Sequence, residues 1–570
     1  MVIKPNLRLF KINLFFPTHR TKDIAAWFVL LVIVFTLYGS VINLWWTNDD
    51  PQILKQAIQY RPWQYFFSPK IWQELSWANL TPLVTLSFDI DIALFSLDPK
   101  MFYFHQLITI WLCSVMFYTV LRLWNPRFIA FIGASIFLIG SPVAVSSQQL
   151  MVRHYIEGLL LAELSFWLFV EGLRKDKIWM AWCSAFFYMA ALSAKELYVP
   201  LVFLLLALPE NNLKDRLKYS MPCLFIFFLY TGWRWGMLGT FIGGYGFFAE
   251  TKYLLTLLYL LPQKVGSVLF GINPLKTNLI VFGIFITLVI FLLRRWQTVV
   301  FALWAGILTI LPILPVSESF PTRFAIVIWF MCIVLLAFAF RYLRKVQLIG
   351  RILGVLLITV TLFYTLLHSR ELWADNLRLS KRISMEGRFF LLKAKEYDLL
   401  RQPAAEFHYF EGLVWLRKNY YGREKVAEWF YDDIYLCEKS LKGKRIWSYS
   451  ETSHQVNDIT QLIPDLKKNF CSTIKQDAPL SIRINYSLPR FSWEFGPYNK
   501  GQYSIILRDD TAKYNLHRRG SLKIRLSEDI LFRISYESPN GWITYSPYLP
   551  LKIVKDTAVA YWERVHNEKD

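Results

Sequence analysis

The chain has 570 residues, of which 55% are hydrophobic and 17% aromatic, and its formal net charge is +21. This composition excludes an ordinary soluble globular protein and is typical of a protein that crosses a membrane several times. The basic residues are scattered between apolar stretches and form no stripe, so we expect them to mark cytoplasmic helix ends, and we expect no nucleic-acid partner.

Apolar stretches long enough to cross about 30 Å of hydrocarbon recur over the first two thirds of the chain. The eleven candidate spans are 24–46, 101–122, 127–147, 155–173, 178–194, 197–209, 218–238, 277–293, 297–315, 322–340 and 350–368. The first is too long for the apolar core of a cleavable signal peptide, so we expect a signal anchor. With the N-terminus in the cytoplasm, every cytoplasmic turn is basic, as the positive-inside rule requires.

One further apolar segment, residues 252–271, would break this alternation if it spanned the membrane, because Arg294 and Arg295 would then lie outside. It contains Pro262, Lys264 and Gly266. We therefore expect a re-entrant or interfacial piece on the outer face.

Paired carboxylates follow the first span immediately, in "WWTNDDPQIL", and open a long outer loop that covers residues 47–100. Asp50 precedes Pro51, a residue favoured at the first helical position, so one of the two acids is expected to cap a helix. Other ionisable side chains reach the same outer level: His105, Arg153, His154, Lys195, Glu196, Arg234 and Arg323. Ionisable groups at membrane depth are costly and are therefore functional candidates.

This set suits group transfer from a lipid-linked phosphate. Cations can hold the phosphate and stabilise its charge as it leaves, and a carboxylate, Asp49 or Asp50, can take a proton from the acceptor. Structural alternatives stay open at this point. Lys195 and Glu196 can form an internal ion pair, and Arg153, Arg234 and Arg323 can be interfacial anchors. The histidines can be packed or capping residues, and Asp89 and Asp91 can be solvated or capping.

After about residue 370 the chain changes character. We expect a mixed, largely helical extracytoplasmic region over 371–480, and a β-sandwich-like domain over 481–570, where apolar and polar residues alternate from Ser481 and again in "SLKIRL". Cys437 and Cys471 lie in this part of the chain and can form a disulfide if it is outside the cytosol.

Several motifs resemble the GT-C glycosyltransferase superfamily, in particular its O-mannosyltransferases with TPR repeats and their bacterial relatives. The similar stretches are "NDDPQIL", "LTPLVTLSFDIDIALFSLDPKMFYFH", "SPVAVSSQQLMVRHYIEGLL", "LSAKELYVPLVFL" and "LPVSESFPTRFAIV". They occur in the family's order over about residues 24–370. The chain departs from the pattern at Thr81, where the family has Arg, at Ile108, where it has Asn, and at the inserted Ala194; no TPR repeats follow.

The resemblance implies a polytopic α-helical membrane protein, with a GT-C-like transmembrane domain over residues 1–370 and the β-rich domain outside. It implies inverting transfer of a sugar from a polyprenyl-phosphate donor to a protein, lipid or glycan acceptor. Asp49 would be the base with Asp50 as helper or cap. Arg153, Lys195 and Arg323 would hold the donor phosphate, and His105, His154 and Glu196 would support them.

Two other functions remain open: a transporter or flippase of lipid-linked sugar, and an inactive GT-C-like scaffold. A transporter is expected to show internal pseudo-symmetry and broken helices at the midplane, and the sequence shows no internal repeat. We expect no cofactor and no metal site, although a divalent ion is not excluded, because two acids alone bind a metal poorly. A bacterial inner membrane, with the C-terminal domain in the periplasm, is the expected location.

Overall fold

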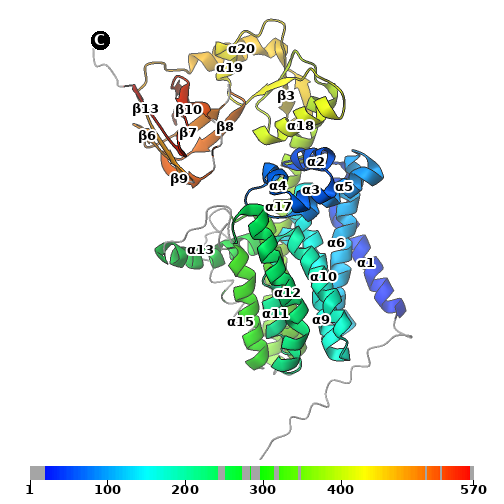
Figure 1. The fold of residues 1–570 in the computed structure, drawn as a ribbon. Coiled ribbons are helices and arrows are strands. Elements are labelled where there is room, and N and C mark those ends of the chain that lie inside the picture. The colour runs from blue at the N-terminus through cyan, green and yellow to red at the C-terminus, as the bar shows by residue number, and fades with distance from the viewer. Residues whose placement is uncertain are drawn as a thin grey trace, which may run out of the picture.

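The computed structural model describes residues 20–241, 251–271, 283, 296–313, 320–343, 348–488, 490–507, 510–524, 526 and 529–564. Helices of different lengths run side by side and form a bundle (Figure 1). They are α1 (Arg20–Tyr38), α6 (Pro99–Arg122), α7 (Arg127–Leu138), α9 (Arg153–Lys175), α10 (Ile178–Ala194), α11 (Leu201–Ala207), α12 (Leu213–Leu238), α15 (Trp296–Ile310), α16 (Ile326–Leu343) and α17 (Leu348–Arg388). Their apolar side chains pack into one large core.

Two helices of the described chain are long and apolar enough to cross a membrane, Thr21–Asn43 and Pro99–Arg122. The other apolar helices are shorter, for example Ile178–Ala194 and Thr322–Phe338. The predicted span 277–293 lies outside the described residues except for residue 283. The number of eleven spans therefore stays a prediction.

One predicted span, 127–147, is wrong as a single helix. The helix α7 ends at Leu138, and a separate short helix, α8 (Ser141–Ser146), begins after Gly140. A Cβ at Gly140 would lie 2.1 Å from the indole nitrogen of Trp329, so this close approach requires glycine. The glycine and the Pro142 that follows break the helix at this point.

The apolar segment 252–271 forms one helix, α13 (Thr251–Phe270), which continues through Pro262. In Figure 1 this helix lies across the direction of α15. Its placement at a membrane surface stays a prediction.

Short helices of the first loop cover one end of the bundle (Figure 1). They are α2 (Asp50–Gln59), α3 (Pro62–Phe67), α4 (Pro69–Leu75) and α5 (Pro82–Phe95). Each has a proline in its first turn, where the missing N–H has no helical partner to lose. The buried Trp72 of α4 donates from its indole to the carbonyl of Asn79, 2.8 Å away, and so fixes the chain between α4 and α5.

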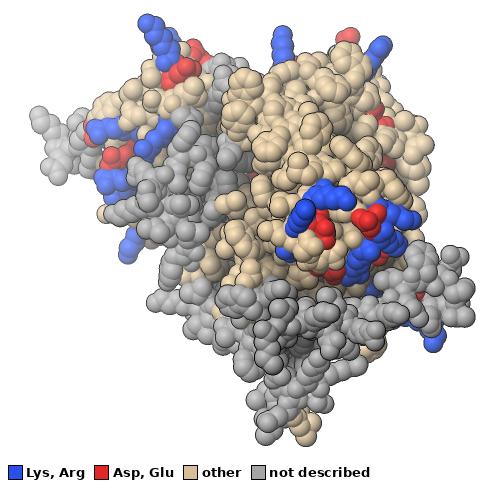
Figure 2. Space-filling model, turned by 60° about the horizontal axis from the view of Figure 1, so that its bottom comes forward, with Lys and Arg blue, Asp and Glu red and all other residues tan. Residues whose placement is uncertain are grey.

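The opposite end of the bundle carries charged side chains. Figure 2, which brings this end forward, shows Lys and Arg gathered there with Asp and Glu. The ion pairs include Arg127–Asp23 at 3.0 Å, Arg174–Glu210 at 2.5 Å and Lys175–Glu171 at 2.5 Å. The basic turns Arg122–Arg127 and Arg174–Lys177 thus lie at the same end, as the charge pattern predicts.

Residues 389–475 form a mixed α/β unit. Its sheet has the order β2-β1-β3-β4, with β1 parallel to both β2 and β3. The strands are β1 (Asp398–Arg401), β2 (Glu428–Phe430), β3 (Arg445–Ser450) and β4 (Gln455–Asp458), and the helices are α18 (Phe407–Asn419), α19 (Ile434–Glu438) and α20 (Ile463–Ser472). The sequence analysis did not foresee this sheet, since short buried parallel strands show no alternation. A disulfide between Cys437 and Cys471, with Cα atoms 6.1 Å apart, joins α19 to α20.

The predicted β-rich C-terminal domain is confirmed. One sheet has the order β11-β10-β7-β8, with β12 also pairing β10, and the other has the order β13-β5-β6-β9. The strands are β5 (Leu480–Ser487), β6 (Arg490–Gly496), β7 (Gln502–Leu507), β8 (Ala512–Leu516), β9 (Arg519–Lys523), β10 (Ile530–Glu537), β11 (Ile543–Tyr545), β12 (Leu549–Leu551) and β13 (Thr557–Arg564). Side chains from both sheets, such as Ile482, Ile484, Phe532 and Ile534, share one core.

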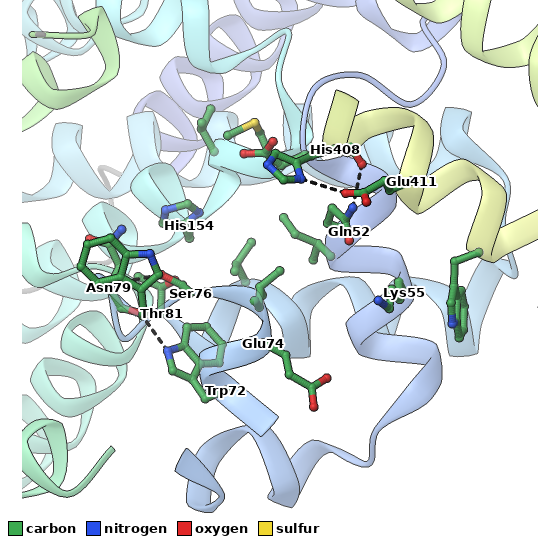
Figure 3. Close-up of a pocket in the computed structure, with 18 of the residues that line it drawn as sticks. Gln52, Lys55, Trp72, Glu74, Ser76, Asn79, Thr81, His154, His408 and Glu411 are labelled. Atoms are coloured by element: carbon green, nitrogen blue, oxygen red, sulfur yellow. Dashed lines mark hydrogen bonds and ion pairs between the residues drawn. The ribbon is translucent and has the colours of Figure 1, made fainter. Parts of the chain in front are cut away.

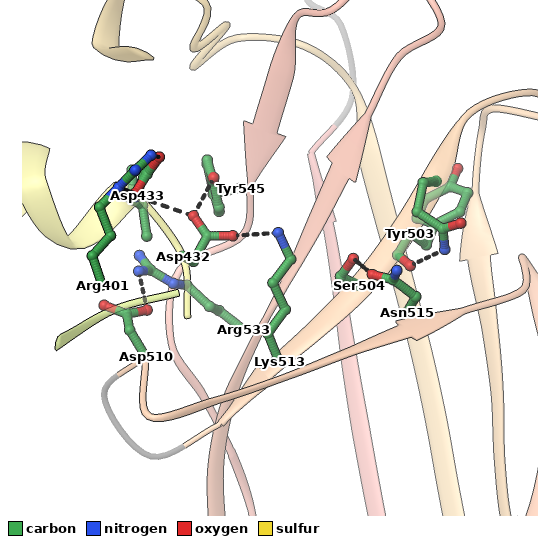
Figure 4. A network of polar contacts seen from close by, with 12 residues as sticks. Arg401, Asp432, Asp433, Tyr503, Ser504, Asp510, Lys513, Asn515, Arg533 and Tyr545 are labelled. Carbon is green, nitrogen blue, oxygen red and sulfur yellow. Dashed lines mark hydrogen bonds and ion pairs between the residues drawn. The ribbon is translucent and has the colours of Figure 1, made fainter. Parts of the chain in front are cut away.

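A buried polar network joins the α/β unit to this β domain (Figure 4). Asp432 accepts hydrogen bonds from Lys513 and from the hydroxyl of Tyr545, each 2.7 Å long. Arg533, only 2% exposed, pairs with Asp510 of its own domain and with Glu438 of α19, the latter at 2.9 Å. Because Asp432, Asp510 and Arg533 are buried and each is paired, these contacts hold the two units together.

Candidate active site

A cavity of about 1030 Å³ lies between the end of the bundle and the α/β unit (Figure 3). Its walls come from α2, α4, the start of α9, the turn after α10, the turn before α16, and α18. The residues that line it include Asp49, Lys55, Glu74, Trp77, Asn79, Thr81, His154, Lys195, Arg323, His408, Glu411, Trp415, Lys418 and Trp429. The volume lies at the upper end of the range of about 300–1,000 Å³ for small-molecule sites.

Asp49 lies in the cavity wall directly before α2. The preceding Asn48 has a left-handed backbone, with φ of 48°, which turns the chain at the end of the first span. Surrounding protein raises the pKa of Asp49, and the charges of Arg323 and His408 oppose this effect. A carboxylate with a raised pKa is a better proton acceptor than an ordinary aspartate.

Asp50 points away from the cavity and is completely buried. Its Oδ2 accepts a hydrogen bond of 2.8 Å from the main-chain N–H of Thr47. Burial raises the pKa of Asp50 to about 7, although the Thr47 hydrogen bond and the charge of Arg153 favour ionisation. Of the two predicted acids, only Asp49 therefore reaches the cavity.

Lys195 and Arg323 form the cationic wall of the cavity. Lys195 follows the end of α10 in an extended conformation, and its ammonium lies 5.0 Å from the centre of the Tyr155 ring and 5.9 Å from that of Phe324. It is only 6% exposed. Within the part of the chain that the structure describes, neither Lys195 nor Arg323 forms an ion pair with a carboxylate. A buried cation without a counterion is costly, so this wall is suited to an anionic ligand.

His154 lines the same wall and is buried. Burial lowers its pKa well below the usual value, and the charges of Lys195 and Arg323 lower it further. The imidazole is therefore neutral at physiological pH and can act as a hydrogen-bonding group beside the two cations.

Arg153 and His105 do not line the cavity. Arg153 is 1% exposed, and its guanidinium is 2.5 Å from a carboxylate oxygen of Asp91 and 4.7 Å from the centre of the Phe88 ring. His105 approaches the other oxygen of Asp91 at 2.7 Å. Asp91, which the sequence indicated as solvated or capping, is thus the buried centre of an ion-pair network. Asp91 neutralises the charge of Arg153, so this charge is not available to a ligand in the cavity.

Glu196 supports the cavity without lining it. It pairs with Arg234 at 2.8 Å, not with Lys195, and it accepts a hydrogen bond of 3.1 Å from the N–H of Leu80. These contacts tie the loop that carries Asn79 and Thr81 to the end of α10. The alternative of a Lys195–Glu196 ion pair is wrong, because the chain turns between the two residues.

The sequence analysis missed the wall that α18 provides. His408, Glu411, Trp415 and Lys418 recur every three or four residues, so they share one helix face, and that face lines the cavity. The Nδ1 atom of His408 and a carboxylate oxygen of Glu411 are 3.0 Å apart, within hydrogen-bond distance. Their spacing was visible in the sequence, but nothing there indicated that this face meets a loop more than 350 residues earlier.

No group of three or more His, Cys, Asp or Glu side chains that could hold a metal ion occurs among the described residues.

No family model matches this sequence. No curated protein matches it either. Solved structures similar to the chain include two of an oligosaccharyltransferase from Archaeoglobus fulgidus. The one in complex with Zn and sulfate has 10% identity and a TM-score of 0.38 over 71% of this chain and 62% of that chain. The one tethered to an acceptor peptide with the NVT sequon has 11% identity and a TM-score of 0.39 over 72% and 64%. This chain thus spans less than two thirds of those proteins, and a likeness at this level assigns it to no family.

Proposed function

We propose that this protein is a membrane glycosyltransferase of the GT-C type that moves a sugar from a polyprenyl phosphate to an acceptor outside the cytoplasm. The observation that carries the proposal is the cavity in which Asp49 shares a wall with Lys195 and Arg323. A base and two cations that form no ion pair with a described carboxylate share this cavity, and these are the two elements that such a transfer needs.

In the proposed reaction, Lys195 and Arg323 hold the phosphate of the donor. Asp49 removes the proton from a hydroxyl group of the acceptor. The acceptor oxygen then attacks the anomeric carbon from the face opposite the phosphate, the carbon–oxygen bond to the phosphate breaks, and the polyprenyl phosphate leaves with both electrons of that bond. The configuration inverts, and the two cations stabilise the additional negative charge on the phosphate.

Two features of the bundle support a membrane location. Large apolar side chains are exposed on several neighbouring helices: Phe186 of α10, Phe225 and Phe228 of α12, Trp304 and Ile307 of α15, and Ile352 and Leu356 of α17. Exposed apolar surface on this scale needs an apolar partner. The basic end of the bundle lies opposite the cavity, so the positive-inside rule places the cavity and the C-terminal units outside the cytoplasm. A bacterial inner membrane with periplasmic C-terminal units fits this orientation.

The test uses the full chain in detergent with undecaprenyl phosphate as the lipid probe, followed by transfer of labelled sugar from polyprenyl-phosphate donors. We expect Lys195→Met and Arg323→Met to weaken lipid-phosphate binding about tenfold each, as the loss of a charged hydrogen bond does. Asp49→Asn is expected to keep this binding and to lose sugar transfer. Lys214→Met, at an exposed lysine in the first turn of α12 at the opposite end of the bundle, is the matched control and should change neither.

The proposal is overturned if the lipid phosphate binds equally well to the Lys195, Arg323 and control variants, or if Asp49→Asn retains full transfer. Movement of lipid-linked sugar across vesicles that survives in Asp49→Asn would instead identify a transporter.

A further inference from the structure

The cavity has two halves of different chemistry. The inner half contains two cations, Lys195 and Arg323, together with the neutral His154 and one acid, Asp49. Its net charge is therefore positive. The outer half is lined from α2, α4 and α18 and contains two lysines, Lys55 and Lys418, and two glutamates, Glu74 and Glu411, beside His408. The formal charges of these lysines and glutamates cancel. An anionic donor is therefore attracted to the inner half, whereas the outer half does not select an ionic ligand.

Two tryptophans line the cavity from different elements. Trp77 follows α4, between Ser76 and Asn79, and Trp415 lies on the cavity-lining face of α18. An indole presents a large flat apolar face with little rotational freedom, and the C–H face of a pyranose ring packs well on such a surface.

Hydrogen-bonding groups surround these indoles. Glu74 accepts one hydrogen bond of 2.7 Å from Tyr60, and Glu411 is held by His408. A carboxylate has about four acceptor positions, so Glu74 can also accept from the hydroxyl groups of a ligand. Figure 3 shows Glu74, Lys55 and Glu411 around the same part of the cavity. A neutral ligand with many hydroxyl groups is bound by aromatic faces, which contact its C–H groups, and by fixed donors and acceptors, which bind its hydroxyl groups.

The volume leaves space for two ligands. A cavity of about 1030 Å³ exceeds what one sugar phosphate fills. Asp49 lies between the two halves, because its carboxyl group interacts with the charge of Arg323 in the inner half and with that of His408 on α18. Gln52 is fixed by a hydrogen bond of 2.6 Å from its amide to the carbonyl of His408, which ties α2 to α18. A hydroxyl group brought in along α18 would therefore arrive next to the base.

We infer that the outer half, between Glu74 with Lys55 and the Trp415 face of α18, is an acceptor subsite, and that the acceptor is a neutral saccharide chain that reaches along the cavity to Trp77. This inference rests on the proposed function, since it assigns the second substrate of the same reaction.

The experiment measures binding of maltotetraose, cellotetraose and chitotetraose to the full chain in detergent by saturation-transfer NMR, with an Asn-Val-Thr hexapeptide as the peptide probe. We expect saturable binding of at least one tetraose and none of the peptide. Trp415→Ala, and independently Trp77→Ala, should weaken this binding about tenfold, the loss expected for one stacked aromatic contact. Trp179→Ala, an exposed tryptophan of α10 far from the cavity, is the matched control.

Undecaprenyl phosphate binding is measured on the same samples. Lipid-phosphate binding that persists without any tetraose binding overturns the saccharide assignment alone. Absence of lipid-phosphate binding overturns the proposed function instead. Tetraose binding that both tryptophan variants retain, or binding of the hexapeptide, also overturns the inference.

Discussion

At the scale of single residues, Asp49 and Asp50 show how strongly local geometry separates two neighbours of the same type. The helix α2 begins at Asp50, so the two side chains leave the backbone in different directions. Asp49 enters the cavity, whereas Asp50 is buried and holds the N–H of Thr47. The residue types alone could predict the pair and a capping role for one member. The choice of Asp49 as the base came only from the family resemblance, because the side chain that enters a cavity depends on what packs against the turn.

The buried Asp50 predicts how the stability of the fold changes with pH. Its pKa is about 7 in the fold against 3.8 for the free group, so between these values the folded state binds a proton that the unfolded state has lost. The free energy of unfolding should therefore fall as the pH rises from about 4 to 7, by about 4 kcal/mol for a shift of roughly three units. Asp50→Asn keeps an oxygen for Thr47 but cannot ionise.

Thermal unfolding of the detergent-solubilised chain at pH 5 and pH 7.5 measures this effect. We expect the wild type to lose more stability than Asp50→Asn between the two pH values. An equal loss of stability in both proteins would show that Asp50 does not cause the dependence of stability on pH.

The cationic residues show the limit of sequence reasoning about the site. Arg153, Lys195 and Arg323 were equivalent candidates, and only Lys195 and Arg323 line the cavity. Arg153 is paired with Asp91, a residue 62 positions earlier in the chain. An ion pair between segments this far apart depends on how α5 packs on α9, and no local pattern reveals it.

At the scale of elements, the contact between α18 and α2 forms the cavity. A Cβ at Gly412 would lie 2.6 Å from the Cβ of Pro51 and 2.9 Å from its main-chain carbon, so only glycine allows the two helices to come this close. The helices of the first loop were predictable from their prolines, and the β domain from its alternation. The packing of α18 on α2 was not, because a glycine within a helix only indicates a close approach and not its partner.

Gly412→Ala is therefore expected to push α18 away from α2 and to move the His408–Trp415 face relative to Asp49. Stability should decrease by about 1–3 kcal/mol, as overpacking does, and ligand binding in the cavity should weaken. Gly232→Ala in α12 is the control, because no atom lies within 4 Å of its added Cβ, and it should be neutral or slightly stabilising. Thermal unfolding of both variants provides the measurement, and equal behaviour of the two would contradict the role of Gly412.

At the scale of the whole molecule, the position of α18 also depends on the β domain. The α/β unit that carries α18 is fixed to the β domain by the network of Asp432, Lys513, Arg533 and Asp510 (Figure 4), together with the Arg533–Glu438 ion pair. Trp429 of the α/β unit makes a further contact with the β domain. It lines the cavity, and its indole N–H donates to the carbonyl of Thr511 at 3.1 Å. The β domain thus stabilises one wall of the cavity without entering it, a role that its own alternating sequence does not indicate.

Arg533→Met tests this dependence. The variant leaves Asp510 buried without its cation, and breaking a buried pair in this way costs about 3–5 kcal/mol. We expect the β domain to separate more often from the α/β unit, so that amide hydrogens of β2 and of residues 431–433 exchange faster with deuterium while those of α6 do not change. Arg519→Met is the control. It breaks an exposed ion pair with Glu494 on the β13-β5-β6-β9 sheet, and such a pair contributes little to stability. If both variants exchange at the wild-type rate at β2, the network does not hold the two units together, and the wall formed by α18 must be fixed by its contact with α2 alone.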